Sequence, residues 1–219
     1  ASAAGMAVNS RSASADAADY DVPTFGNLSL LHFTDCHAQL MPVHFREPNF
    51  NIGVGKAFGQ PPHVVGERFL EHFAIPAGSA NAYAFTCLDF EAAAHKYGKV
   101  GGFAHLATLV KRLRASRPNS LLLDGGDTWQ GSATSLWTKG QDMVDACKLL
   151  GVDIMTGHWE FTYGMDRVRE IIERELPPIE FLAQNIMLTE DASFEGKPAF
   201  DEDSGRVFKP YSIREMNGI

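Results

Sequence analysis

Residues 120–127 read Ser-Leu-Leu-Leu-Asp-Gly-Gly-Asp, a short apolar run that ends in two glycines and a carboxylate. Two other segments of the chain follow the same plan. Asp35-Cys36-His37 comes after the apolar run 28–33, and Gly157-His158-Trp159-Glu160 comes after Ile154-Met155. This pattern is typical of strands that deliver metal ligands at their carboxyl ends, where open α/β sheets bind ligands.

Strands alternate with amphipathic helices along most of the chain, which predicts βαβ units and a mainly parallel sheet. The predicted strands are Leu28–Thr34, Ser120–Leu123, Asp153–Thr156 and Phe181–Ala183, and the predicted helices are 101–116, 141–150 and 163–176. Pro118, Gly151 and Pro177-Pro178 mark the ends of the helices. The expected fold class is therefore α/β, with a layered sheet flanked by helices.

Two regions depart from this alternation. Residues 41–100 form a long, poorly periodic stretch, which we expect to be functional or to carry small elements of its own. At the other end, Tyr211–Met216 is predicted as a strand and Asn217-Gly218 is a strong hairpin signal. Only Ile219 follows, so we expect the native polypeptide to continue.

Composition narrows the class of protein. A chain of 219 residues is long enough for one domain plus a tail, and its net charge of −8 argues against nonspecific nucleic-acid binding. No stretch approaches the roughly 18 apolar residues of a membrane span. The three cysteines, Cys36, Cys87 and Cys147, do not form the pattern of a disulfide framework. Residues 1–27 are expected to be a disordered leader, since the first part is rich in Ala and Ser and lacks periodicity.

The candidate ligands are Asp35, His37, Asp127 and His158. In an extended chain, residues two apart face the same side, so Asp35 and His37 are expected to point into one site. Asp127 follows two glycines that let the backbone approach an ion, and its carboxylate can bridge two cations. Each motif alone also fits a plain turn. The three together favour a metal site, because all are expected at one edge of the sheet.

The motifs resemble those of the 5′-nucleotidase branch of the calcineurin-like metallophosphoesterases. In that branch the third motif usually reads Gly-Asn-His-Glu or Gly-Asn-His-Asp. Here His158 stands where the family has a metal-binding Asn, and Trp159 stands where it has a His that stabilises the transition state. Within the branch, this departure is similar to the SoxB thiosulfohydrolases of bacterial sulfur oxidation. Longer strings agree with that resemblance, at residues 31–40, 44–48 with 51–53, and 124–132.

The resemblance implies a periplasmic enzyme with two Mn²⁺ ions. Asp35 and His37 would bind the first ion, Asp127 would bridge both, and His158 would bind the second. It also implies that residues 28–219 are the N-terminal part of a metallophosphoesterase-like catalytic domain. The later histidines that complete the second site, and a C-terminal domain, would lie outside this chain, so we expect this piece alone to be inactive.

The implied reaction is hydrolysis of a cysteine S-thiosulfonate, presented on a flexible arm of the SoxY carrier in the SoxYZ complex, with release of sulfate. Two other functions stay open: a 5′-nucleotidase-like phosphoesterase, and a binding module whose site is degenerate. Trp159, Glu160 and Arg46 are candidates to contact the metal ligands from outside or to contact the substrate. Gln184-Asn185 is a weaker site candidate, and His105 is expected to pack on the apolar side of its helix.

Overall fold

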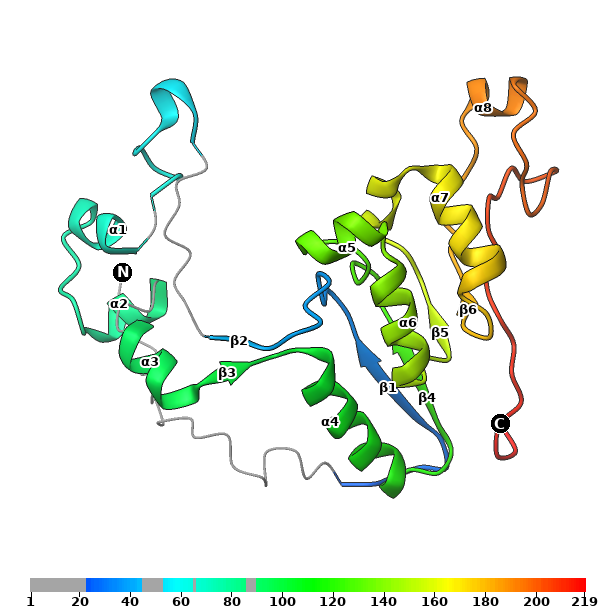
Figure 1. Cartoon of the computed structure of the whole chain (residues 1–219), viewed down its shortest axis with the longest axis horizontal. Helices are drawn as coiled ribbons and strands as arrows, with labels where there is room; N and C mark the ends of the chain where they lie inside the picture. Colours follow the sequence, from blue (N-terminus) through cyan, green and yellow to red (C-terminus); the bar gives the residue numbers. More distant parts are fainter. Residues whose placement is uncertain (1–22, 45–52, 65, 86–89) are drawn as a thin grey trace, which may run out of the picture.

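The computed structural model describes residues 23–44, 53–64, 66–85 and 90–219. A four-stranded parallel sheet in the order β1-β4-β5-β6 organises the fold (Figure 1). Its strands are β1 (Ser29–Phe33), β4 (Ser120–Asp124), β5 (Ile154–Met155) and β6 (Glu180–Phe181). The α/β prediction and the four predicted parallel strands are confirmed.

The four strands are paired so that their carboxyl ends lie level. Phe33 is opposite Asp124, Asp124 is opposite Met155, and Met155 is opposite Phe181. The loops that follow these strands therefore leave the sheet at the same edge, the usual place for ligands in open α/β sheets. This register brings the three motif segments of the sequence next to one another.

Helices α4 (Phe103–Ser116), α6 (Gln141–Leu150) and α7 (Met165–Glu170) lie over one face of the sheet (Figure 1). Helix α5 (Ala133–Thr138) packs against α6. The inward face predicted for α6 is confirmed, because Met143, Val144 and Cys147 are fully buried in the core. Within the described ranges, no helix is both long and apolar enough to cross a membrane.

The single helix predicted over 163–176 is wrong in detail. A 3-10 helix, η3 (Trp159–Tyr163), comes first, and α7 then continues into a π-helical turn, η4 (Ile171–Glu175). The Leu176 N–H donates to the carbonyl of Ile171, five residues earlier, at 2.7 Å. Ile171 and Leu176 are both fully buried. The wider turn therefore accompanies the burial of two apolar side chains just before Pro177-Pro178 ends the helix.

Residues 41–100 make an excursion from the sheet. β2 (Val43–His44) and β3 (Lys99–Val100) pair antiparallel at its base. Between them lie η2 (Gly55–Ala57), α1 (Gly66–His72), α2 (Ala80–Phe85) and α3 (Phe90–Tyr97), which Figure 1 shows apart from the main sheet. The expectation that this stretch carries small elements of its own is confirmed.

The C-terminal segment follows α8 (Glu190–Phe194) and returns beside β6. The strand predicted over Tyr211–Met216 is wrong: these residues form no strand, and side-chain contacts of Arg214 with Glu180 hold the segment instead of a ladder. The Asn217-Gly218 turn is present, with φ of 49° and 81°. Reciprocal backbone bonds between Met216 and Ile219 close it, as in a two-residue hairpin turn.

Glu180 provides a pH-dependent anchor for this segment. Hydrogen bonds from Arg214 and Lys209 lower its pKa from 4.5 to about 2. Because the folded pKa lies below the unfolded one, the anchor stabilises the fold above about pH 4.5 and is lost as the pH falls towards 2. We expect Glu180→Gln to lower the thermal unfolding midpoint at neutral pH, and the difference from wild type to vanish near pH 2 by circular dichroism.

The matched control is Glu195→Gln, which removes a far more exposed ion pair with Lys197 and should change the midpoint little. A Glu180→Gln effect of equal size at all pH values would contradict an electrostatic anchor.

Candidate metal centre

Backbone hydrogen bonds join the loop after β1 to the loop after β4. The Asp35 N–H donates to the carbonyl of Gly126 at 3.0 Å, and the His37 N–H donates to the carbonyl of Asp127 at 2.9 Å. A third bond of this kind links Ala38 to Thr128 at 3.0 Å. These bonds continue the β1–β4 pairing beyond the strands and hold the two motif segments in register.

The side chains of Asp35 and His37 do come together, but not by strand alternation. β1 ends at Phe33, and the backbone of Asp35 and His37 then turns into the left-handed region, with φ of 56° and 46°. Asp127 has φ of 59°. The extended geometry expected from the sequence is therefore wrong, and left-handed turns, which Asp tolerates better than most residues, bring these groups together.

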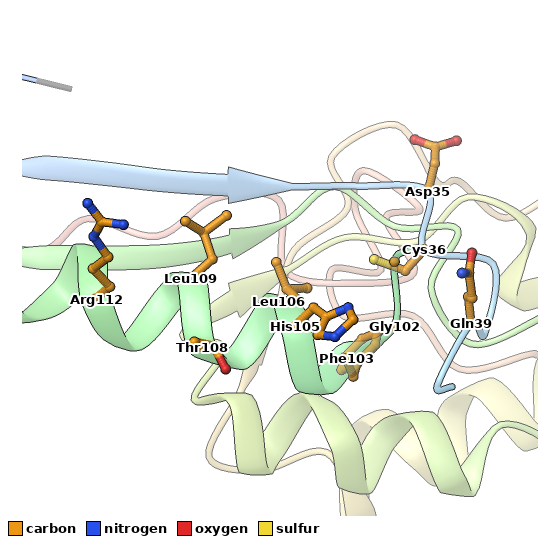
Figure 2. A pocket seen from close by; sticks show the side chains of 11 residues that line it. Asp35, Cys36, Gln39, Gly102, Phe103, His105, Leu106, Thr108, Leu109 and Arg112 are labelled. Carbon is orange, nitrogen blue, oxygen red and sulfur yellow. The ribbon is translucent and has the colours of Figure 1, made fainter. Parts of the chain in front are cut away.

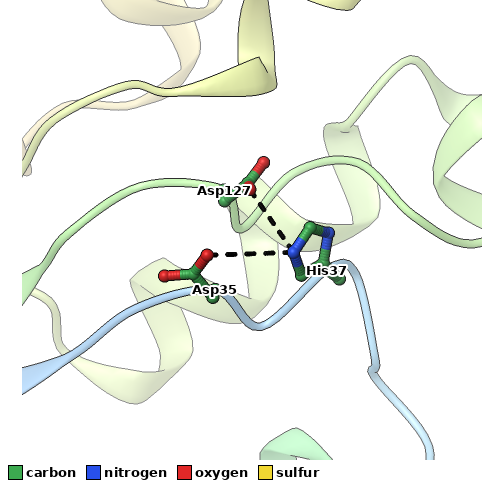
Figure 3. Close-up of side chains that lie close together, drawn as sticks. All are labelled: Asp35, His37 and Asp127. Carbon is green, nitrogen blue, oxygen red and sulfur yellow. Dashed lines mark ion pairs between the residues drawn. The ribbon is translucent and has the colours of Figure 1, made fainter. Parts of the chain in front are cut away.

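Asp35, His37 and Asp127 form a triad whose potential ligand atoms all lie within 4.8 Å of one another (Figure 3). His37 Nε2 is 3.3 Å from Asp127 Oδ2 and 3.9 Å from Asp35 Oδ1. The side chain of Asp127 is 7% exposed, whereas those of Asp35 and His37 are more than half exposed. Carboxylate oxygens and imidazole nitrogens form a donor set that fits a divalent ion.

His158 approaches the same carboxylate from a third loop. Its Nδ1 is 3.0 Å from Asp127 Oδ2, so one oxygen of Asp127 lies between two imidazoles. Burial acts to raise the pKa of Asp127, but hydrogen bonds from His158 and Gln130 and the charge of His37 outweigh burial and lower it. The hydrogen bond to Asp127 raises the pKa of His158. The carboxylate is therefore held in its ionised form, ready to accept a cation.

Gln130 is a residue of this centre that sequence reasoning did not single out. Its amide nitrogen donates to Asp127 Oδ1 and lies 3.2 Å from His37 Nδ1. An amide NH₂ can only donate, so Nδ1 accepts here and Nε2 of the neutral ring carries the proton that faces Asp127 Oδ2. Nε2 must lose that proton before it can bind a metal ion. The signal was its position three residues after Asp127, within reach of the same carboxylate.

Two buried carboxylates lie beneath these loops. Asp124 is 2% exposed, and its Oδ1 accepts hydrogen bonds from the Gly126 N–H at 3.0 Å and the Thr128 hydroxyl at 2.8 Å. Glu160 is completely buried and accepts backbone N–H bonds from Thr128 and His158 at 2.7 and 2.6 Å. Both carboxylates shape the backbone around Asp127 without facing the triad.

The other candidates from the sequence lie in different surroundings. Trp159 is 63% exposed beside His158. Gln184 is exposed and lines a separate cavity with Arg206 and Lys209, so it does not join the triad. Arg46 lies outside the described residues.

A cavity of about 520 Å³ adjoins the triad at Asp35 and runs along α4 (Figure 2). Its walls combine apolar side chains of α4, such as Leu106 and Leu109, with the polar groups of His105 and Arg112. His105 is exposed here, so the prediction that it packs with the apolar positions is wrong.

The two described thiols are poor ligands and nucleophiles at neutral pH. Burial, and then the charges of Asp124 and Asp35, raise the pKa of Cys36 to about 11. Burial and Asp124 also raise the pKa of Cys147 well above its ordinary value. Because the thiolate is the reactive form, both groups are held in an inert state.

Comparisons with known proteins agree on one group of relatives. The chain is similar to the sulfate thiohydrolase SoxB of Thermus thermophilus, with 34% identity and a TM-score of 0.60, over 90% of this chain and 35% of that one. It shares its fold with the NAD nucleotidase of Haemophilus influenzae, at 19% identity and a TM-score of 0.52, over 87% of this chain and 24% of that one.

Among curated relatives, the 5′-nucleotidase of Rattus norvegicus is 34% identical over 120 residues, which cover 54% of this chain and 19% of that protein. No protein-family model matches the chain. The chain thus spans about a third of the SoxB structure and about a fifth of the rat enzyme.

Asp124 should make stability depend on pH in the acidic range. Burial raises its pKa from 3.8 to about 6, so the folded state binds an extra proton between these values and loses stability as the pH rises through them. A shift of this size corresponds to about 3 kcal/mol. We expect Asp124→Asn, which keeps the acceptor oxygen, to flatten the unfolding free energy between about pH 4 and pH 6 in urea titrations. An unchanged slope would contradict this assignment.

Gly131 lets the loop after Asp127 pass close to His37. Its φ is +126°, and a Cβ there would lie 2.4 Å from the His37 carbonyl oxygen. We expect Gly131→Ala to displace His37 and to lower the free energy of unfolding by roughly 1–3 kcal/mol, measured by urea denaturation. Gly196→Ala is the control, because its positive φ meets no neighbour within 4 Å. Equal losses in both variants would show that φ alone, rather than the contact with His37, sets the cost.

Proposed function

Because this chain is SoxB-like and falls in the 5′-nucleotidase branch of the calcineurin-like phosphoesterases, we propose that it forms part of a thiosulfohydrolase. The substrate is a cysteine S-thiosulfonate on the SoxY arm of the SoxYZ carrier. Water adds to the sulfonate sulfur, the bond from that sulfur to the sulfane sulfur breaks, sulfate leaves, and the carrier keeps a cysteine persulfide.

We assign Asp35 and His37 to a first metal ion, Asp127 to both ions, and His158 to a second ion. The single observation that carries this proposal is the position of Asp127 Oδ2, which is 3.3 Å from His37 Nε2 and 3.0 Å from His158 Nδ1. A carboxylate shared by ligands from two separate loops is what a bridging role requires. The SoxB resemblance favours Mn²⁺, although Asp and His ligands also accept zinc or iron.

A bound pair of divalent ions would lower the pKa of a coordinated water and neutralise the oxygens of a tetrahedral anion. The residues of the chain prepare that place. Gln130 orients His37 and Asp127, and the lowered pKa of Asp127 keeps its charge at neutral pH. The side chains of His37 and His158 are 52% and 62% exposed, which leaves their edges open to a substrate carried by another protein.

The identity of Trp159 favours a sulfonate rather than a phosphate as the group that is hydrolysed. An indole offers only a neutral N–H donor, whereas a histidine at this position can become a cation. A site without that cation suits a less highly charged group than a phosphate monoester. Phosphatase activity that rivals sulfate release would count against this part of the proposal.

The remaining assignments concern the domain organisation of the chain and its location. We propose that residues 28–219 belong to the catalytic domain, that residues 1–27 form a leader, and that the enzyme works in the periplasm. A 5′-nucleotidase activity is the second candidate, because the rat 5′-nucleotidase is 34% identical over 120 residues. A degenerate, non-catalytic module is the third, and metal content distinguishes it.

The test uses the full-length protein and a SoxYZ carrier whose SoxY cysteine bears the S-thiosulfonate. We expect about two manganese ions per molecule by elemental analysis and sulfate release by ion chromatography. Asp127→Asn should lower the rate of sulfate release roughly 100-fold or more. Losing a residue that only hydrogen-bonds to a metal ligand commonly lowers metal affinity or activity roughly 10- to 100-fold, and Asp127 is proposed as a ligand itself. Glu195→Gln, far from the centre, is the matched control.

Each outcome points to one candidate. Hydrolysis of AMP without sulfate release from the carrier would replace the thiosulfohydrolase proposal by the nucleotidase. A protein that purifies without metal and binds none would leave the non-catalytic module.

A further inference from the structure

The three loops of the centre are held to one another in different ways. Backbone bonds join the loop of Asp35 and His37 to that of Asp127. Among the described residues, the loop of His158 has its backbone bond to the β4 side at its start, where the Thr156 N–H donates to the carbonyl of Asp124 at 3.1 Å. Beyond Thr156, side chains make the attachment. His158 Nδ1 contacts Asp127 Oδ2 at 3.0 Å, the Tyr163 hydroxyl donates to the carbonyl of Trp129 at 3.0 Å, and Glu160 holds the backbone of His158.

Glu160 divides its two oxygens between the loops. Oε1 accepts the N–H groups of Thr128 at 2.7 Å and Trp129 at 3.3 Å, directly after Asp127. Oε2 accepts the N–H of His158 at 2.6 Å. Within the part of the chain that the structure describes, no ion pair reaches this fully buried carboxylate. Backbone N–H groups therefore stabilise its buried charge, so their positions and its own depend on each other.

We propose that Glu160 is a positioning residue that fixes His158 against Asp127 and thereby controls binding of the second metal ion, separately from the first. This inference rests on the proposed function for the existence of two ions. The first ion depends on Asp35, His37 and Asp127, whose loops are joined by their own backbone bonds. The second depends on His158, whose backbone is held by Glu160.

Replacing Glu160 by glutamine should affect the second metal site and not the first, because glutamine offers different hydrogen-bonding groups. It has one acceptor oxygen and one NH₂ donor in place of two acceptors. The oxygen is best placed at Oε1, where two N–H groups converge, and the NH₂ then faces the N–H of His158, a repulsive contact between donors. Glu160→Gln should therefore release the His158 loop and leave the Thr128 side bonded.

The experiment measures Mn²⁺ binding to the full-length protein by isothermal titration calorimetry and by electron paramagnetic resonance. We expect Glu160→Gln to weaken the second ion roughly 10- to 100-fold while the first is unchanged, as for outer partners of metal ligands. The spectrum of the spin-coupled ion pair should give way to that of a single Mn²⁺. His158→Ala, which removes the ligand itself, should give the same pattern.

Asp153→Asn is the matched control. Asp153 also accepts a backbone N–H, that of Leu122 at 2.7 Å, and joins neighbouring strands away from the centre. We expect this variant to lower the unfolding midpoint while leaving both ions bound as in wild type. Should Glu160→Gln fail to fold cooperatively, Glu160→Asp, which keeps the charge but shortens the reach, should show the same selective loss.

A second readout does not depend on metal. In the metal-free protein, Glu160→Gln should accelerate amide hydrogen exchange at His158 by NMR and leave Thr128 protected. Unchanged binding of both ions, or equal weakening of both, would overturn the positioning role. A wild-type protein that binds no metal would instead overturn the proposed function, while the exchange at His158 would still test the role of Glu160.

Discussion

The backbone bonds between the loop after β1 and the loop after β4 are the constraint on which the centre depends. They extend the parallel pairing of the strands by several residues, from the Asp35 N–H on Gly126 to the Ala38 N–H on Thr128. Because backbone bonds set this spacing, the donor atoms of the triad are brought close together, and Gln130 adds side-chain contacts to Asp127 and His37. Strand pairing thus fixes the backbone positions of the site, and the exposed side chains of Asp35 and His37 extend from these fixed positions.

The carboxylates in this region differ in their surroundings according to their depth below the surface. Asp127 lies between two imidazoles and has a lowered pKa, so it stays ionised next to the exposed side chains of His37 and His158. One layer below, burial raises the pKa of Asp124 to about 6, while Glu160 is surrounded by backbone N–H groups. The buried carboxylates shape the loops, and the shared carboxylate is left to meet a cation.

The third motif contains both a candidate metal ligand, His158, and the buried residue that holds its loop, Glu160. His158, Trp159 and Glu160 are consecutive, yet the first lies beside Asp127, the second is exposed and the third is fully buried. A short 3-10 helix beginning at Trp159 allows successive side chains to take these separate directions. A change in the outer residues of this motif can therefore alter the chemistry while its buried glutamate keeps the loop in place.

The sequence by itself determined the α/β class, the mainly parallel sheet implied by βαβ units, and the approach of the three motifs, because parallel strands end at one edge of a sheet. Only the tertiary structure decided how the side chains meet. Left-handed turns replaced the expected extended geometry at Asp35 and His37, and the role of Gln130 emerged from its contacts. Likewise, 211–216 formed no strand. Periodicity reports which face of an element is buried, whereas turn geometry and hydrogen bonds between loops depend on partners distant in sequence.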